Sequence, residues 1–346
     1  MPMAIERATF VAVAARDDRK IRAHSINLDA SAEIDLSEAE KPREKGFWMN
    51  FIEGMARILE RRGFEIKGAD LLIWSDVPTG AGLSSSAALE TSVGLALSEI
   101  SGAKVDRTTL ALVGQQTEHE FVGAKVGIMD QFVSANAKKD HALLLDCRSL
   151  EFENVPLAAQ KRDVVIAICD TNVKHDLAAS EYNTRRAECE RAVEILQRFL
   201  PGIEQLRDVT VEGLEKFESE LPEPVRRRAR HVVTENARTL EAADCLKKSD
   251  FSDFGRLMWQ SHESLKNDYE VSCRELDLLV EIASETDGAL GARMTGGGFG
   301  GSTVNLVGRE NLENFQAKIV AEYRRETGIE PNILVSNAAE GAAEVS

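Results

Sequence analysis

Apolar and polar positions along the chain predict strands first and helices later. Short stretches rich in apolar and β-branched residues predict strands at 8–16, 19–27, 31–37, 69–77, 141–147, 162–171 and 330–337. Apolar residues at helical spacing predict helices at 47–63, 86–100, 105–123 and 311–328. A tight polar turn at Asp17–Asp18 joins the first two strands, Gly63 is the expected end of the first helix, and Asp106 is the expected N-cap of the third.

The middle of the chain has a different character. Residues 178–287 are mainly amphipathic helix, interrupted at Pro201–Gly202 and Pro222–Pro224. Because strands lead one half and helices dominate much of the other, the pattern favours an α+β fold with two lobes. We expect domains at 1–160 and 161–346, and a frayed tail over 338–346.

Composition narrows the function classes. The chain has 346 residues and a net charge of -16, which argues against nucleic acid or an anionic membrane as partner. The one basic run, Val225–Arg230, is expected to be a solvated helix face. No apolar run is long enough to span a membrane, and the first residues do not resemble a secretory signal. Five cysteines without paired spacing fit reduced thiols, so we expect a cytoplasmic protein.

The segment Asp76–Glu90, DVPTGAGLSSSAALE, places glycines and three serines between a strand and a helix. No lysine follows Gly82, so the segment is not a Walker A loop, and Ser85 at the sixth position weakens a dinucleotide fingerprint. A helix N-terminus attracts phosphate, glycines let the backbone approach closely, and serine hydroxyls can ligate Mg²⁺. The segment therefore predicts a phosphate site, with a glycine turn and a serine N-cap as the alternative.

Acidic residues gather in QQTEHEFVGAKVGIMDQF. On a helix, Glu118 would share a small, apolar face with Gly114, which predicts a carboxylate that is paired, protonated or bound to metal. Glu120 is expected to be solvated, and His119 to be packed and hydrogen-bonded, with a ligand role as the alternative. Asp130 follows the turn allowed by Gly127 and is either a general base or a helix cap or buried ion pair.

A second glycine-rich stretch lies near the C-terminus. MTGGGFGGSTVNLV has five glycines over Gly296–Gly301, interrupted by Phe299, and a strand follows it. Because a strand and not a helix follows, this loop is no anion site by itself. Its glycines predict close packing of one backbone against another loop or a ligand, with a flexible turn as the alternative.

The loop PTGAGLSSSAALE closely resembles the phosphate loop of the GHMP small-molecule kinases, and its three serines resemble the galactokinases in particular. The resemblance runs from Met1 to about Val335, and the glycine-rich stretch resembles the third motif of the family. It implies a two-lobed GHMP kinase fold that uses ATP and Mg²⁺ to phosphorylate galactose at its C1 hydroxyl. The nucleotide-binding residues that it implies are Gly80, Ala81, Gly82, Leu83, Ser84, Ser85 and Ser86.

Further roles follow from the resemblance alone. Asp130 in GIMDQF matches the catalytic aspartate, and Glu118 matches a magnesium ligand together with Ser86, for which Ser85 is the alternative. Asp130, Gly127 and Tyr182 match positions at the sugar. Trp48 matches an aromatic residue near the adenine, although core packing is the better expectation from its pattern. SLKNDYEVSCRELDLLV also resembles galactokinases and is expected to support the site without taking part in chemistry.

One family segment, reading roughly P-G-R-V-N-L-I-G-E-H-T-D-Y, does not occur in this sequence. In relatives it supplies an arginine and several contacts to the sugar hydroxyls. We expect that the start is trimmed or misassigned, because the retained motifs show no decay; a truly short protein with an open sugar pocket is the alternative. A catalytically silent sugar- and ATP-binding regulator and a kinase for N-acetylgalactosamine stay open as functions. We expect a monomer.

Overall fold

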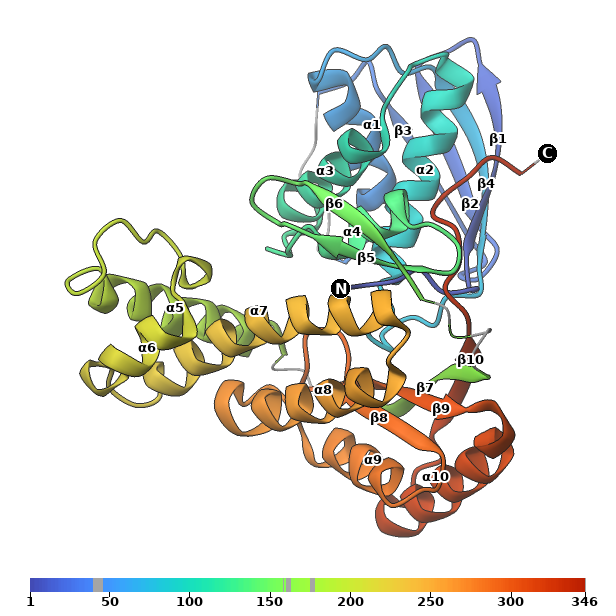
Figure 1. Ribbon diagram of the computed structural model, residues 1–346. Coiled ribbons are helices and arrows are strands. Elements are labelled where there is room, and N and C mark those ends of the chain that lie inside the picture. The colour runs from blue at the N-terminus through green and yellow to red at the C-terminus, as the bar shows by residue number, and fades with distance from the viewer. Residues whose placement is uncertain (40–45, 158, 160–162, 175–177, 346) are drawn as a thin grey trace. The chain divides into compact units, whose positions relative to one another are not determined.

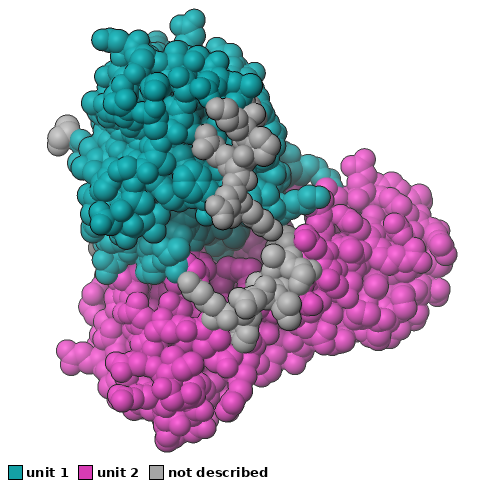
Figure 2. All heavy atoms as spheres, turned by 180° about the vertical axis from the view of Figure 1, so that it is seen from behind, with its two compact units in different colours: residues 1–79, 84–156, 337–346 teal, residues 80–83, 157–336 magenta. Residues whose placement is uncertain are grey.

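The computed structural model describes residues 1–39, 46–157, 159, 163–174 and 178–345 (Figure 1). The chain forms two compact units (Figure 2). The first contains residues 1–79, 84–156 and 337–346, and the second contains 80–83 and 157–336. The last ten residues therefore belong to the first unit, whereas the sequence pattern predicts domains at 1–160 and 161–346.

The first unit is built on a four-stranded sheet covered by helices on one face. The strand order is β1-β4-β2-β3, with bounds Thr9–Arg16 for β1, Lys20–Ser25 for β2, Ala30–Asp35 for β3 and Gly68–Ser75 for β4. All three predicted N-terminal strands are present, but β1 and β2 do not pair with each other. Instead β4 lies between them, antiparallel to β1 and parallel to β2.

The helices of the first unit bury one face of this sheet. They are α1 (Met49–Arg61), α2 (Ser85–Ser101), α3 (Arg107–Thr117), the π-helix η1 (Glu118–Val122) and α4 (Met129–Asn136). Ile21, Leu71 and Ile73 of the sheet form one core with apolar residues of α1 and α2. Since burying apolar side chains supplies most of the stabilising free energy, this core fixes α2 on the sheet. Trp48 packs at the edge of the same core, as its pattern predicts.

Local signals place the ends of these helices. Asp106 caps α3 by accepting a hydrogen bond of 2.9 Å from the backbone N–H of Thr109, as predicted. Gly63, two residues after α1, adopts a positive φ of 91°, which suits a residue without a Cβ. A two-stranded sheet of β5 (His141–Leu145) and β6 (Phe152–Pro156) completes the unit.

The C-terminal tail is held against the first unit. Ala339 donates a backbone hydrogen bond to Ala4, and Gly341 and Ala342 donate to Ala137 and Ser134, at 2.8–2.9 Å. The prediction of a tail frayed from 338 onward is therefore wrong as far as Ala342, because the backbone of those residues is paired. No local pattern pointed to these partners, because they lie about 200 positions or more earlier in the chain.

The second unit carries the other sheet, in the order β10-β7-β9-β8. Its strands are β7 (Val164–Lys174), β8 (Ala289–Met294), β9 (Gly300–Gly308) and β10 (Asn332–Ser336). Its longer helices are α5 (Ala178–Leu196), α7 (Val225–Lys248), α8 (Phe251–Ser264), α9 (Arg274–Ser284) and α10 (Leu312–Thr327). Shorter ones are α6 (Val211–Phe217), the π-helix η5 (Leu265–Tyr269) and the 3₁₀ turns η3 (Leu206–Asp208), η4 (Glu218–Glu220) and η6 (Arg309–Asn311).

The basic run at the start of α7 is not simply a solvated face. Val225 and Arg228 are buried, and Arg228 pairs with Glu188 and Glu270. That part of the prediction is wrong, because α5 and the segment after η5 pack over this turn of α7. Among the described residues, none of the helices is both long enough and apolar enough to cross a membrane.

Candidate functional site

The serine-rich segment begins α2 in an unusual backbone conformation. Ser84 is the N-cap residue, with φ 60° and ψ 44°. This is a left-handed backbone conformation that residues other than glycine rarely adopt. Its hydroxyl makes no capping hydrogen bond to the first turn. Ser84 therefore does not act as an ordinary serine N-cap, which was the alternative interpretation of this segment. Non-glycine residues held in this region cluster at functional sites.

The structure brings Ser86, Glu118 and Asp130 together in the first unit. Glu118 is only 4% exposed, and the Ser86 hydroxyl lies close enough to its carboxylate to influence its ionisation. Burial raises the pKa of Glu118; the nearby Ser86 hydroxyl opposes that rise, and the negative charge of Asp130 adds to it. A carboxylate with a raised pKa beside a second acid is suited to receive a cation or a proton.

Each of these residues is positioned by its own helix. Ser86 lies in the first turn of α2, and Glu118 begins η1 where α3 ends. Asp130 lies in the first turn of α4, a helix that the sequence pattern did not predict. Gly127 precedes α4, but it does not have a positive φ, and a Cβ there would meet nothing within 4 Å. The expectation that the turn needs glycine at 127 is therefore not supported by its backbone.

A buried acid that sequence reasoning missed lies beneath these residues. Glu90 of α2 is fully buried and accepts a hydrogen bond of 3.2 Å from the Gln131 side chain of α4. Burial, followed by the charge of Glu118, raises the pKa of Glu90 well above its usual range. A Cβ on Gly114 of α3 would lie 2.9 Å from Gln131 and 3.2 Å from Glu90, so the glycine makes room for the pair.

Gly80 and Gly82 of the predicted phosphate site belong to the second unit, where Gly82 lies against the glycine-rich turn between β8 and β9. Gly80 and Gly82 have positive φ angles of 79° and 72°. The Ser302 hydroxyl donates a buried hydrogen bond of 2.7 Å to the carbonyl of Ala81. A Cβ on Gly296 would lie only 3.3 Å from the carbonyl oxygen of Gly82, and one on Gly301 equally close to that of Ala81. Close backbone packing, as predicted for these glycines, is what the structure shows.

Other residues singled out in the sequence lie elsewhere or cannot be described. Glu120 is exposed and pairs with Arg61. His119 is hydrogen-bonded to the Val126 carbonyl at 2.8 Å, but it is exposed and not packed. Tyr182 falls within α5, and its side chain lies outside the described part of the structure. Across the described residues, no three acids, histidines or cysteines are grouped so that they alone could hold a metal ion.

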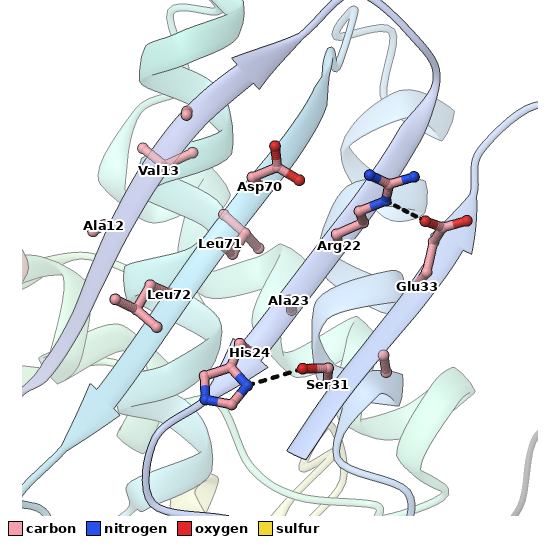
Figure 3. A pocket seen from close by; sticks show the side chains of 12 residues that line it. Ala12, Val13, Arg22, Ala23, His24, Ser31, Glu33, Asp70, Leu71 and Leu72 are labelled. Atoms are coloured by element: carbon pink, nitrogen blue, oxygen red, sulfur yellow. Dashed lines mark hydrogen bonds and ion pairs between the residues drawn. The ribbon is translucent and has the colours of Figure 1, made fainter. Parts of the chain in front are cut away.

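A separate hollow of about 740 Å³ lies on the outer face of the first sheet (Figure 3). Ala12, Leu72 and Asp70 line it, together with two hydrogen-bonded pairs, His24–Ser31 and Arg22–Glu33. These residues alternate with those that face the core, which is why the sheet presents them outward. None of the predicted site residues lines this hollow.

Two family models match the chain. The GHMP kinases N terminal domain matches residues 50–138, which include the serine-rich segment, Glu118 and Asp130. The GHMP kinases C terminal domain matches residues 242–325, which include the glycine-rich loop.

Individual relatives agree with the family models. The chain is 46% identical to the galactokinase of Chloroflexus aurantiacus over 99% of its own length and 87% of that protein. It is 40% identical to the galactokinase of Actinobacillus succinogenes, covering 99% and 88% of the two chains. The crystal structure of Lactococcus lactis galactokinase complexed with galactose superimposes with a TM-score of 0.93 at 37% identity, over 99% of this chain and 88% of that one. These matches confirm the α+β fold and the resemblance found in the motifs. The chain belongs to the galactokinases of the GHMP kinase family.

Proposed function

We propose that this protein transfers the γ-phosphoryl group of ATP to the C1 hydroxyl of galactose. The observation that carries the proposal is the grouping of Ser86, Glu118 and Asp130 at the starts of three helices of the first unit. Phosphoryl transfer depends mainly on positioning and on neutralising charge, and these residues can supply both.

The segment Gly80–Ser86 is our candidate for the phosphate-binding loop. Positive φ angles at Gly80, Gly82 and Ser84 turn the backbone sharply before α2 begins. The first turn of a helix has backbone N–H groups without helical partners and carries partial positive charge. We therefore assign the phosphates of ATP to this end of α2, with the hydroxyls of Ser84, Ser85 and Ser86 as further donors.

Ser86 and Glu118 fit a magnesium ion. Mg²⁺ prefers oxygen ligands and commonly takes one or two from the protein, and the rest from phosphate and water. The adjacent hydroxyl and carboxylate of this pair supply two such oxygens. A cation here would also favour the ionised form of Glu118, which burial alone disfavours. When bound, Mg²⁺ would neutralise charge on the transferred phosphoryl group.

Asp130 is our candidate for the residue that accepts the proton from the sugar. It lies near Glu118, as the effect of its charge on that carboxyl requires, and it is half-buried. We assign it the role of holding the C1 hydroxyl and removing its proton as the oxygen attacks phosphorus. Glu90 and Gln131 keep the first turn of α4 in place beneath it.

Galactose is the proposed acceptor because the relatives are named galactokinases and one was crystallised with galactose. Galactose-dependent release of ADP from ATP by the purified chain tests the proposal, with glucose and N-acetylgalactosamine as competing acceptors. Rapid release with galactose alone supports it. ATP binding without release for any of the sugars would favour the silent-regulator alternative and contradict the proposal. We propose that the protein acts in the cytoplasm. We also propose that it is a monomer, and analytical sedimentation can test this oligomeric state.

A further inference from the structure

The glycine-rich loop contacts the backbone of Val271. The backbone N–H of Phe299 donates to the Val271 carbonyl at 2.7 Å. A Cβ on Gly298 would lie 2.2 Å from that same oxygen, so the two backbones are in direct contact. Phe299 has a φ of 61°, which is unfavourable for a side chain of its size. The shape of this loop therefore depends on where Val271 is held.

Val271 follows the end of a continuous helix formed by α8 and η5. The last carbonyls of a helix have no partners within it. Here arginines from two other helices supply those partners. Arg228 of α7 donates to the carbonyl of Asp268 at 2.6 Å, and Arg185 of α5 donates to the carbonyls of Tyr269 and Glu270 at 2.7 and 2.9 Å.

Arg185 makes the more direct connection to the loop. It is 8% exposed, and its guanidinium uses two different nitrogens on two successive carbonyls immediately before Val271. The same guanidinium lies 5.9 Å from the centre of the Phe299 ring. Glu181 and Glu188 on its own helix lie 3.2 and 3.7 Å from it and balance its charge. A planar fork is required for this arrangement, and lysine cannot reproduce it.

We propose that Arg185 is a positioning residue for the nucleotide site. It fixes the segment Tyr269–Val271; Val271 fixes Gly298–Phe299; and the glycine-rich loop in turn packs against Ala81 and Gly82. The motif around Tyr269, for which the sequence predicts only a supporting role, is thus the link between α5 and the phosphate loop. This inference rests on the proposed function in one respect, namely that Gly80–Ser86 binds ATP.

The test compares two neighbouring arginines of α5 changed to the same residue. Arg185→Met keeps the apolar stem but removes the fork, whereas Arg186→Met removes an exposed arginine paired with Glu190 at 2.9 Å. Binding of MgATP is measured by isothermal titration calorimetry, and the KM for ATP by ADP release. We expect R185M to weaken ATP binding roughly tenfold or more, the equivalent of one lost hydrogen bond to a charged donor, with R185K in between. R186M should match the unmodified protein. Equal ATP affinity of R185M and R186M would overturn the inference.

A second measurement, which needs neither R185M nor ATP binding, tests the inference if R185M does not fold or if the protein does not bind ATP. Hydrogen exchange of the peptide spanning 295–302 is followed without nucleotide in the unmodified protein, R185K and R186M. Faster exchange in R185K alone, with unchanged exchange in β4, supports the positioning role. Unchanged exchange at 295–302 in R185K overturns it. Absence of ATP binding by the unmodified protein would count against the proposed function, and the exchange rates would then decide whether Arg185 positions the loop.

Discussion

Gly298 and Val271 approach so closely that a single added methyl group would not fit between them. A Cβ on Gly298 would lie 2.2 Å from the carbonyl oxygen of Val271 and 2.9 Å from its Cβ, and Gly298 also has a φ of 86°. Two independent constraints, steric and conformational, thus require glycine at this position. The neighbouring Gly297 has neither, because a Cβ there would meet nothing within 4 Å and its φ is not in the left-handed region.

The substitutions Gly298→Ala and Gly297→Ala form a matched pair. We expect G298A to displace the glycine-rich loop and to raise the KM for ATP at least about tenfold, since the left-handed conformation alone costs about 1–2 kcal/mol with a Cβ. G297A should stay within about twofold of the unmodified protein, the size of an ordinary surface substitution. Steady-state kinetics with varied ATP measures both. Equal KM values for the two variants would show that this contact does not shape the nucleotide site.

The buried carboxyl of Glu90 should make the stability of the protein fall as pH rises. Burial raises its pKa well above the usual value in the folded protein, so the folded state binds a proton that the unfolded state has already lost. Stability contributed by protonated Glu90 is therefore present below the unfolded pKa and falls as pH rises above it. Glu90→Gln is neutral at every pH and can still accept the hydrogen bond from Gln131. We expect E90Q to gain stability relative to the unmodified protein by up to about 1.4 kcal/mol per pH unit above about pH 4.5.

Urea denaturation of the metal-free protein at several pH values measures this difference. Glu99→Gln is the control, because Glu99 lies on the same helix but is exposed. The difference in unfolding free energy between E99Q and the unmodified protein should not change with pH. A difference for E90Q that is also independent of pH would mean that Glu90 is ionised in the folded protein, contrary to its burial.

Replacing Glu118 should raise the concentration of magnesium that the protein requires for activity. If its carboxylate and the Ser86 hydroxyl hold the ion, Glu118→Gln removes the charged ligand and keeps the shape. We expect the Mg²⁺ concentration for half-maximal activity to rise by tenfold or more, as a lost charge-assisted interaction of about 1.5–3 kcal/mol implies. Glu120→Gln, two positions away and exposed, should leave it unchanged. A magnesium titration that is the same for both variants would remove Glu118 from the metal site.

Local signals in the sequence predicted most of the elements, but not α4, β6 or β8, and they did not predict the pairing between distant strands. Asp106 caps its helix and Gly63 takes a positive φ, because both effects depend only on neighbouring residues. The turn at Asp17–Asp18 is also local, yet the strands that it joins are separated by β4, which comes more than 40 positions later. Which strand fills that place is decided by packing against α1 and α2, and a single sequence does not display that packing.

The candidate site shows the same division. Small residues at 80–86 and acids at 118 and 130 are visible as motifs, whereas the grouping of Ser86, Glu118 and Asp130 with Glu90 and Gln131 exists only in the fold. A signal for Glu90 was available, since it lies four residues after Ser86 and therefore on the same face of α2 in an apolar helix. The burial of Arg228 could not be predicted in this way. It lies in a run of arginines, and the sequence does not show which of them packs against α5 and η5.

We propose that Asp130 takes part in phosphoryl transfer and not in holding the nucleotide. The most direct measurement compares ADP release and MgATP binding for Asp130→Asn, with Asp140→Asn, an exposed aspartate of the same unit, as control. We predict that D130N lowers galactose-dependent turnover by about 10²–10⁴-fold while ATP affinity and D140N turnover stay near those of the unmodified protein. Turnover by D130N equal to that of D140N would contradict the account.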